Sequence, residues 1–102
     1  MRIDVVGKKI EITDAILKYA EDKAAKLPRY FDGVQKIQFT LTQEDHHKTG
    51  LFGAELVIDV EKHDDFVSHA KGPDLYAAID EVVQKGVRQL SDFKERLKMG
   101  KR

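Results

Sequence analysis

Basic and aromatic residues gather in two segments of this chain, and together they could bind the phosphates and bases of a nucleic acid. The first group comprises Lys23, Lys26, Arg29 and Tyr30, and the second comprises Lys85, Arg88, Arg96 and Lys98. Lysine and arginine attract phosphate, and a tyrosine ring can stack on a base or a ribose. If the two segments lie side by side, they form one cationic ridge suited to RNA. The spacing leaves open an ordinary solvated helix face that binds nothing.

Residues that could bind a metal or catalyse a reaction are fewer. His46 and His47 adjoin Glu44 and Asp45, but adjacent histidines in a polar loop lack the spacing that directs both rings to one ion. We expect a solvated loop over residues 43–50, with no metal and no cofactor. No glycine-rich phosphate loop is present, and an enzyme would require scattered aspartates and histidines to converge in the fold. We therefore expect a protein that is not an enzyme.

The first basic group needs a helix to hold it, and the sequence predicts one over residues 13–27. Thr13 can cap the first turn by accepting a hydrogen bond from a free backbone N–H group. Pro28 then ends the helix. The apolar stripe that would be buried consists of Ile16, Leu17, Ala20, Ala24 and Leu27.

The second basic group lies on a longer amphipathic helix, which is predicted to begin after Pro73 with Asp74 as its cap. Gly86 lies in the apolar stripe at a cost of about 1 kcal/mol relative to alanine, so we expect the helix backbone to approach a large side chain of the sheet. Asp92 lies four residues from Arg88 and from Arg96 and can pair with both. The apolar stripe consists of Leu75, Ile79, Val82, Val83, Leu90, Phe93 and Leu97.

Alternation of apolar and polar residues predicts four strands, at residues 2–6, 34–42, 51–61 and 66–71. The element order is therefore β-α-β-β-β-α. A strand, a helix and a strand in succession imply a right-handed crossover and a parallel pair. We expect an α+β fold in which a four-stranded mixed sheet carries both helices on one face.

Length and composition are those of one domain with a modest core. The chain has 102 residues, of which 41% are hydrophobic, and no cysteine, which excludes disulfides and thiolate chemistry and suits a reducing compartment. No apolar run approaches the roughly 18 residues that span a bilayer, and residues 1–4 do not open a signal peptide. We expect a single domain over residues 1–102, located in the cytoplasm, with no membrane partner.

Charge is unevenly distributed along the chain. The formal net charge is zero, but residues 1–42 carry +2, residues 43–73 carry −4 and residues 74–102 carry +2. A zero total argues against nucleic-acid binding, whereas the local field depends on how the charges are separated. The separation is compatible with a cationic helical surface.

Several motifs resemble the ribosome hibernation promoting factor family, which includes ribosome-associated inhibitor A. The most specific are Glu11-Ile12-Thr13, Lys26-Leu27 followed by Tyr30-Phe31-Asp32, and above all Asp74-Leu75-Tyr76-Ala77-Ala78-Ile79-Asp80 followed by Lys85, Arg88-Gln89-Leu90, Lys94 and Leu97-Lys98. The resemblance extends over nearly the whole chain. It implies the same β-α-β-β-β-α fold, akin to double-stranded-RNA-binding domains.

The resemblance also implies a function. Proteins of this family bind the small ribosomal subunit and its 16S rRNA between head and body, block the sites of messenger and transfer RNA, and inhibit translation in stressed or stationary cells. The rRNA contacts that it implies are Lys23, Lys26, Tyr30, Lys85, Arg88, Lys94 and Lys98, whereas Arg29 and Arg96 are added by the charge argument. Two departures are Asp92, where relatives commonly carry a basic residue, and Gly86, where relatives carry a larger apolar one.

The resemblance further suggests the short form of the family, because longer relatives continue into a dimerisation domain that this chain lacks. We expect a monomer when the protein is free. Whether the bound state is a single inactive 70S ribosome or paired ribosomes stays open. Two alternative functions also stay open: a general binder of structured RNA, and a protein–protein regulator that acts through an acidic outer face of the sheet.

Overall fold

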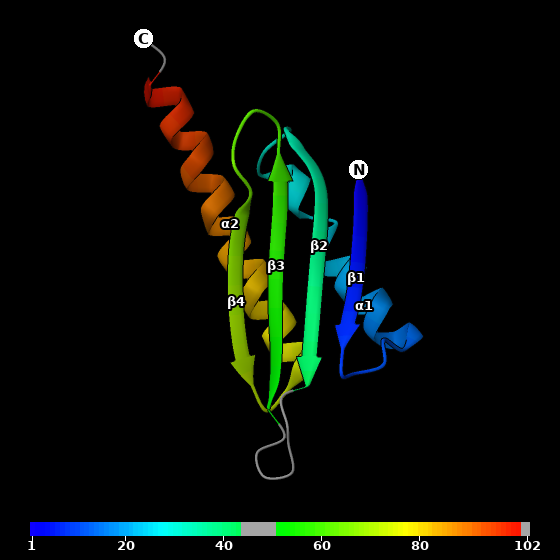
Figure 1. Ribbon diagram of the computed structural model, residues 1–102. Coiled ribbons are helices and arrows are strands. Elements are labelled where there is room, and N and C mark those ends of the chain that lie inside the picture. The colour runs from blue at the N-terminus through cyan, green and yellow to red at the C-terminus, as the bar shows by residue number, and fades with distance from the viewer. Residues whose placement is uncertain (44–50, 101–102) are drawn as a thin grey trace.

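Four strands form one sheet, and two helices pack on one of its faces (Figure 1). The computed structural model describes residues 1–43 and 51–100. The elements are β1 (Arg2–Lys8), α1 (Asp14–Ala24), a short 3-10 helix η1 (Leu27–Arg29), β2 (Val34–Gln43), β3 (Phe52–Val60), β4 (Phe66–Gly72) and α2 (Leu75–Gly100). The predicted α+β class and element order are confirmed.

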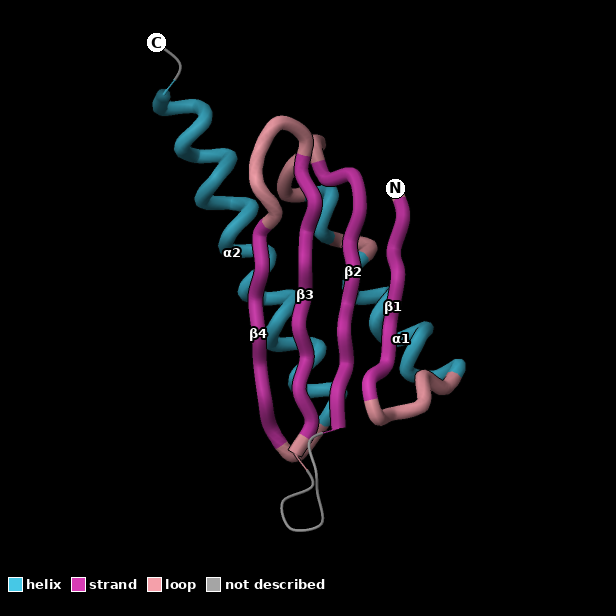
Figure 2. Tube along the Cα trace, viewed as in Figure 1, coloured by secondary structure: helices cyan, strands magenta, loops and turns pink. Residues whose placement is uncertain are grey.

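The strands lie side by side in chain order, β1-β2-β3-β4 (Figure 2). β1 and β2 are parallel, as the strand-helix-strand succession predicts, and the other two pairs are antiparallel. Ile3 lies opposite Ile37, and Phe39 lies opposite Leu56. Because side chains alternate between the two faces of a strand, this register places the apolar residues of neighbouring strands on the same face.

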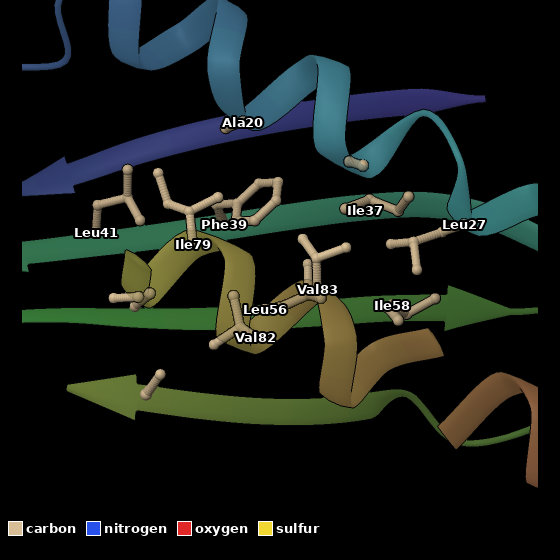
Figure 3. Packing of buried hydrophobic residues seen from close by; sticks show 14 of the residues in the cluster. Ala20, Leu27, Ile37, Phe39, Leu41, Leu56, Ile58, Ile79, Val82 and Val83 are labelled. Carbon is tan, nitrogen blue, oxygen red and sulfur yellow. The ribbon is translucent and has the colours of Figure 1, made fainter. Parts of the chain in front are cut away.

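The hydrophobic core fills the space between that face and the helices (Figure 3). Phe39, Leu56 and Ile58 of the sheet are completely buried, and so are Ile79 and Val82 of α2. Complete burial of side chains of this size stabilises the fold by roughly 1.5–3 kcal/mol each. The core therefore holds α2 firmly in place on the sheet.

Both predicted helix caps are present. The Thr13 Oγ1 atom accepts a hydrogen bond from the Ile16 backbone N–H at 3.2 Å. The Asp74 Oδ1 atom accepts bonds from the N–H groups of Tyr76 and Ala77, at 3.0 and 3.4 Å. Each cap satisfies backbone donors that have no partner within the helix.

The first helix is shorter than the sequence predicts. α1 ends at Ala24, and Leu27 belongs instead to the separate turn η1, which contains Pro28. Proline has no N–H to donate to the fourth preceding carbonyl, so the chain tightens into a 3-10 turn in which Tyr30 donates to the Leu27 carbonyl at 2.9 Å. Leu17 is only partly buried, unlike the rest of the predicted stripe.

The last two turns of α2 project beyond the sheet (Figure 1). Phe93 is the last buried residue, and Leu97 is 46% exposed. The prediction that Leu97 belongs to the buried stripe is therefore wrong, because the pattern continues past the end of the surface that could cover it. Within the described residues, no helix is long and apolar enough to cross a membrane.

Gly86 marks the closest approach of α2 to the sheet. A Cβ atom at this position would lie 2.9 Å from the Ile58 Cδ1 atom and 3.1 Å from the Leu56 Cδ2 atom. The expected close approach of the helix backbone to large side chains is confirmed. The contact explains why a residue that disfavours helices is accommodated here.

Enlarging residue 86 should separate α2 from the sheet. We expect Gly86→Leu to lower the free energy of unfolding in urea by roughly 1–3 kcal/mol, because the added carbons overpack the core. Gly86→Ala should change it little, because the better helix propensity offsets contacts with side-chain ends that can shift.

The matched control is Ser91→Leu, which adds the same side chain at an exposed position of α2. Its effect should stay within about 0.5 kcal/mol. Wild-type stability of Gly86→Leu would contradict the assigned contact.

Candidate nucleic-acid interface

The two segments that carry the predicted contacts are neighbours in the fold. α2 packs on β3 and β4, and α1 packs against β1 and against α2 (Figure 1). The turn η1 also contacts α2. The expected side-by-side arrangement of the two basic segments is therefore confirmed.

A polar junction joins α1 to α2. The Tyr19 hydroxyl donates a hydrogen bond to Asp80 Oδ1 at 2.7 Å, and the Tyr19 ring meets the Tyr76 ring edge to face at 4.8 Å between centroids. Lys23 Nζ lies 3.7 Å from the same Asp80 oxygen and 5.2 Å from the centroid of the Tyr19 ring. Lys23 is thus held in a helix–helix junction, where a carboxylate balances its charge.

The turn η1 places the remaining residues of the first group beside the second half of α2. Leu27 is completely buried and anchors the turn. The Phe31 ring then packs against the Phe93 ring at 5.1 Å between centroids. Arg29 and Tyr30 are exposed and Lys26 is partly exposed next to α2.

α2 presents its basic residues on two flanks. On one flank, Lys85 Nζ donates to the His69 carbonyl at 2.7 Å and Gln89 Nε2 donates to the Val67 carbonyl at 3.0 Å, so this flank faces β4. Asp80 faces α1 and marks the opposite flank.

Helical periodicity assigns the other basic residues to these flanks. Arg88 and Arg96 follow Lys85 on the β4 flank, whereas Lys94 and Lys98 follow Asp80 on the α1 flank. The basic residues of α2 therefore form two rows and not the single ridge that the sequence left open as one possibility.

Two of the predicted contact residues have carboxylate partners. Lys23 pairs with Asp80, and Lys85 Nζ lies 3.2 Å from Glu81 Oε2. Both pairs are substantially exposed and contribute little to stability, but they lower the local positive charge. In residues 1–43 and 51–100, the predicted cations that form no ion pair are Lys26, Arg29, Arg88, Lys94, Arg96 and Lys98.

The expected pairs of Asp92 do not form. Within the described part of the chain, neither Arg88 nor Arg96 lies within 4.0 Å of its carboxylate. All three side chains are exposed, and an exposed pair gains less than about 1 kcal/mol against the entropy of holding two long side chains. Asp92 therefore weakens the field of the β4 row without occupying either arginine.

The outer face of the sheet is mixed in charge. Asp4 lies 3.1 Å from Arg2 Nε and 3.9 Å from Lys36 Nζ, and Glu55 lies 3.1 Å from His69 Nε2. The acidic outer face that the sequence suggests is therefore not what the described residues form. Carboxylates of residues 43–73 share the sheet with cations of β1 and β2, which a segment-by-segment charge count cannot reveal.

The candidate metal cluster at Glu44, Asp45, His46 and His47 lies outside the described residues, as does the predicted loop after Gln43. Among residues 1–43 and 51–100, no group of three or more histidines and carboxylates could hold a metal ion.

Several residues at this interface were given no role from the sequence. Asp80 links the two helices through a partner 61 positions away, and only the packing of the helices reveals the pair. Gln84, Gln89 and His69 line a hollow with Lys85 and Arg88. The spacing of Lys85 and Gln89, four residues apart, was the available signal that both face one strand.

Comparisons with known proteins agree over nearly the full chain. The family model described as sigma 54 modulation protein / S30EA ribosomal protein matches residues 3–98. The ribosome hibernation promoting factor of Escherichia coli (strain K12) is 34% identical over 98 residues, which cover 96% of this chain and 98% of that protein. The protein of the same name from Azotobacter vinelandii is 32% identical over 101 residues, which cover 94% of this chain and 85% of that protein.

Solved structures show the same fold. The N-terminal domain of Protein Y from Thermus thermophilus is similar with a TM-score of 0.81 and 34% identity, over 91% of this chain and 99% of that one. A ribosomal subunit interface protein from Coxiella burnetii is similar with a TM-score of 0.80 over 93% of this chain and 99% of that one. Its identity is 20%, so this second likeness supports the fold alone.

The helix junction should be visible in a pH titration. The hydrogen bond to Asp80, together with burial and the negative charge of Asp80, raises the pKa of Tyr19 from 10.0 to about 12. The raised pKa stabilises the fold below pH 10, and this stabilisation is lost as the pH rises through about 12. The difference in phenolate absorbance between wild type and Tyr19→Phe should therefore show a step near pH 12.

Asp80→Asn is the diagnostic variant, because it removes the charge and keeps the shape of the side chain. It should move the step down toward pH 10. A step near pH 10 in the wild type would mean that the junction does not form.

Proposed function

This chain belongs to the sigma 54 modulation protein / S30EA ribosomal protein family, and from that membership we propose that it is a ribosome hibernation factor of the cytoplasm. It binds the small ribosomal subunit at the 16S rRNA of the decoding and transfer-RNA sites. Messenger and transfer RNA are thereby excluded, and translation is inhibited during stress or in stationary phase.

The observation that supports this proposal best is the set of unpaired cations on the helical layer. Although the net charge is zero, Lys26, Arg29, Arg88, Lys94 and Arg96 form no ion pair within the described residues, and neither does Lys98. On the outer sheet face, by contrast, Arg2 and Lys36 share the carboxylate of Asp4, and His69 lies beside Glu55. The helical layer therefore offers a polyanion six cations that no carboxylate occupies.

The mechanism is occupation of a site, and no bond is made or broken. Lysine and arginine side chains bind rRNA phosphates, and exposed Tyr30 can stack on an unpaired base. α2 has 26 residues and therefore a length of about 39 Å, which lets one rigid element follow several successive phosphates.

Binding should weaken steeply with salt, because each phosphate contact releases counterions. If all six unpaired cations contact phosphates, the affinity for small subunits should fall about a thousandfold between 50 and 200 mM monovalent salt. Co-sedimentation with purified small subunits at constant magnesium measures this slope. Retention that does not change with salt would contradict the electrostatic account.

Reversing charge on either row should abolish ribosome binding. Lys26→Glu with Lys94→Glu alters the residue that precedes η1 and the α1 row, and Arg88→Glu with Arg96→Glu alters the β4 row. Each pair should reduce co-sedimentation at least tenfold while the circular dichroism spectrum stays that of the wild type, because all four positions lie outside the core. Wild-type binding by both pairs would refute the helical interface.

The matched control is Lys9→Glu with Lys62→Glu. It changes the net charge by the same amount at two exposed turn positions, so it should bind as the wild type does.

A competition experiment with plain RNA duplex distinguishes the proposal from general RNA binding. Equal affinity for duplex and small subunit would favour the general binder.

A further inference from the structure

A hollow of about 620 Å³ runs between α2 and the edge strand β4. Its walls come from both elements, and its lining residues are mostly polar: Val67, Ser68, His69, Glu81, Gln84, Lys85, Arg88 and Gln89. The size is within the range of small-ligand sites in proteins, roughly 300–1,000 Å³.

The backbone of β4 offers hydrogen-bond donors to this hollow. β4 pairs with β3 on one side only, and residues of an antiparallel strand point their N–H and C=O groups alternately to one side and the other. The carbonyls of Val67 and His69 point toward α2, since they accept bonds from Gln89 and Lys85. The N–H groups of these two residues therefore point toward α2 as well.

An extended peptide is a poor fit for this edge. A strand that adds to a sheet needs both donors and acceptors from the edge. Here the Val67 and His69 carbonyls already accept bonds from Gln89 and Lys85, at 3.0 and 2.7 Å. What the edge retains is its donors, and a phosphate oxygen requires only donors.

The charge of the hollow matches a single phosphodiester. Lys85 and Glu81 pair at 3.2 Å and largely cancel, and His69 Nε2 lies 3.1 Å from Glu55 outside the hollow. Arg88 is the remaining cation, and it forms no ion pair in the described part of the chain. A guanidinium group binds phosphate oxygens in a two-pronged geometry.

Gln89 has an unused acceptor at this position. Its Oε1 atom is buried and has no hydrogen-bond partner among the described residues. A shift of the side chain that exposes this oxygen and keeps the Nε2 bond to the Val67 carbonyl would let it accept from a base amino group. Gln84, exposed on the same wall, supplies a second amide.

We propose that the hollow between α2 and β4 binds one phosphodiester of a single-stranded RNA segment together with the adjoining base. The Val67 and His69 N–H groups and Arg88 hold the phosphate, and the amides of Gln84 and Gln89 contact the base. This inference rests on the proposed function, because it assigns an unstacked rRNA nucleotide to one defined place on the protein.

The test is titration of the ¹⁵N-labelled 102-residue chain with the dinucleotide ApA, followed by NMR. Saturable shifts of the Val67 and His69 amide signals are expected. Arg88→Gln should weaken ApA binding at least fivefold, whereas the control Lys62→Gln should leave it unchanged. Shifts confined to other regions of the protein would overturn the proposal.

Val67→Pro tests the backbone donor itself. It removes an N–H that faces away from β3, and edge strands tolerate proline at such positions. ApA binding should weaken at least threefold with the spectrum otherwise folded. If this variant does not fold, the Arg88→Gln titration decides, and unchanged ApA affinity in Arg88→Gln overturns the proposal.

Parallel titrations identify the source of the nucleotide. Inorganic phosphate should bind more weakly than ApA, and tighter binding of AMP than of ApA would overturn the assignment to an RNA chain. An unlabelled β-strand peptide that shifts the same amides would overturn it in favour of a protein partner.

Ribosome co-sedimentation separates this inference from the proposed function. ApA binding in the hollow without ribosome binding would support the hollow as an RNA site and refute the proposed function. Ribosome binding without any ApA shift at Val67 or His69 would refute the hollow as an RNA site and support the proposed function.

Discussion

The close contact of α2 with the sheet at Gly86 is the constraint on which the rest of the interface depends. A side chain at this position would meet Ile58 within 2.9 Å and Leu56 within 3.1 Å. Because the helix backbone lies so near the sheet, Lys85 and Gln89 reach the β4 carbonyls on one flank, and Asp80 reaches Tyr19 on the other. Raising the helix would loosen both flanks together.

The fold converts a neutral chain into a molecule with two different faces. On the outer sheet face Asp4 pairs with Arg2 of its own strand and with Lys36 of the next strand. On the helical layer and around η1, six cations have no carboxylate partner in residues 1–43 and 51–100. Lys23 pairs with Asp80, and Lys85 pairs with Glu81. These two lysines therefore help to position neighbouring side chains and contribute less positive charge to the surface. The cations without a carboxylate partner are consequently concentrated around η1 and in the distal half of α2.

Local patterns predicted the elements, caps and core well, because alternation, 3.6-residue periodicity and capping residues act within a few positions of each other. The end of α1 and the exposure of Leu97 were predicted wrongly, since they depend on a proline turn and on where the sheet stops. The division of α2 into two rows and the role of Asp80 depend on contacts between elements. Resemblance to a family does not show which contacts an individual side chain makes with another element.

The most direct test of the central claim is lysine footprinting of the protein bound to purified small ribosomal subunits, read by mass spectrometry after acetylation. If the helical layer faces rRNA, Lys26, Lys94 and Lys98 become protected, whereas Lys8 and Lys36 of the sheet keep the reactivity they have in the free protein. Protection of Lys8 and Lys36, with the three helical-layer lysines still reactive, would contradict the account.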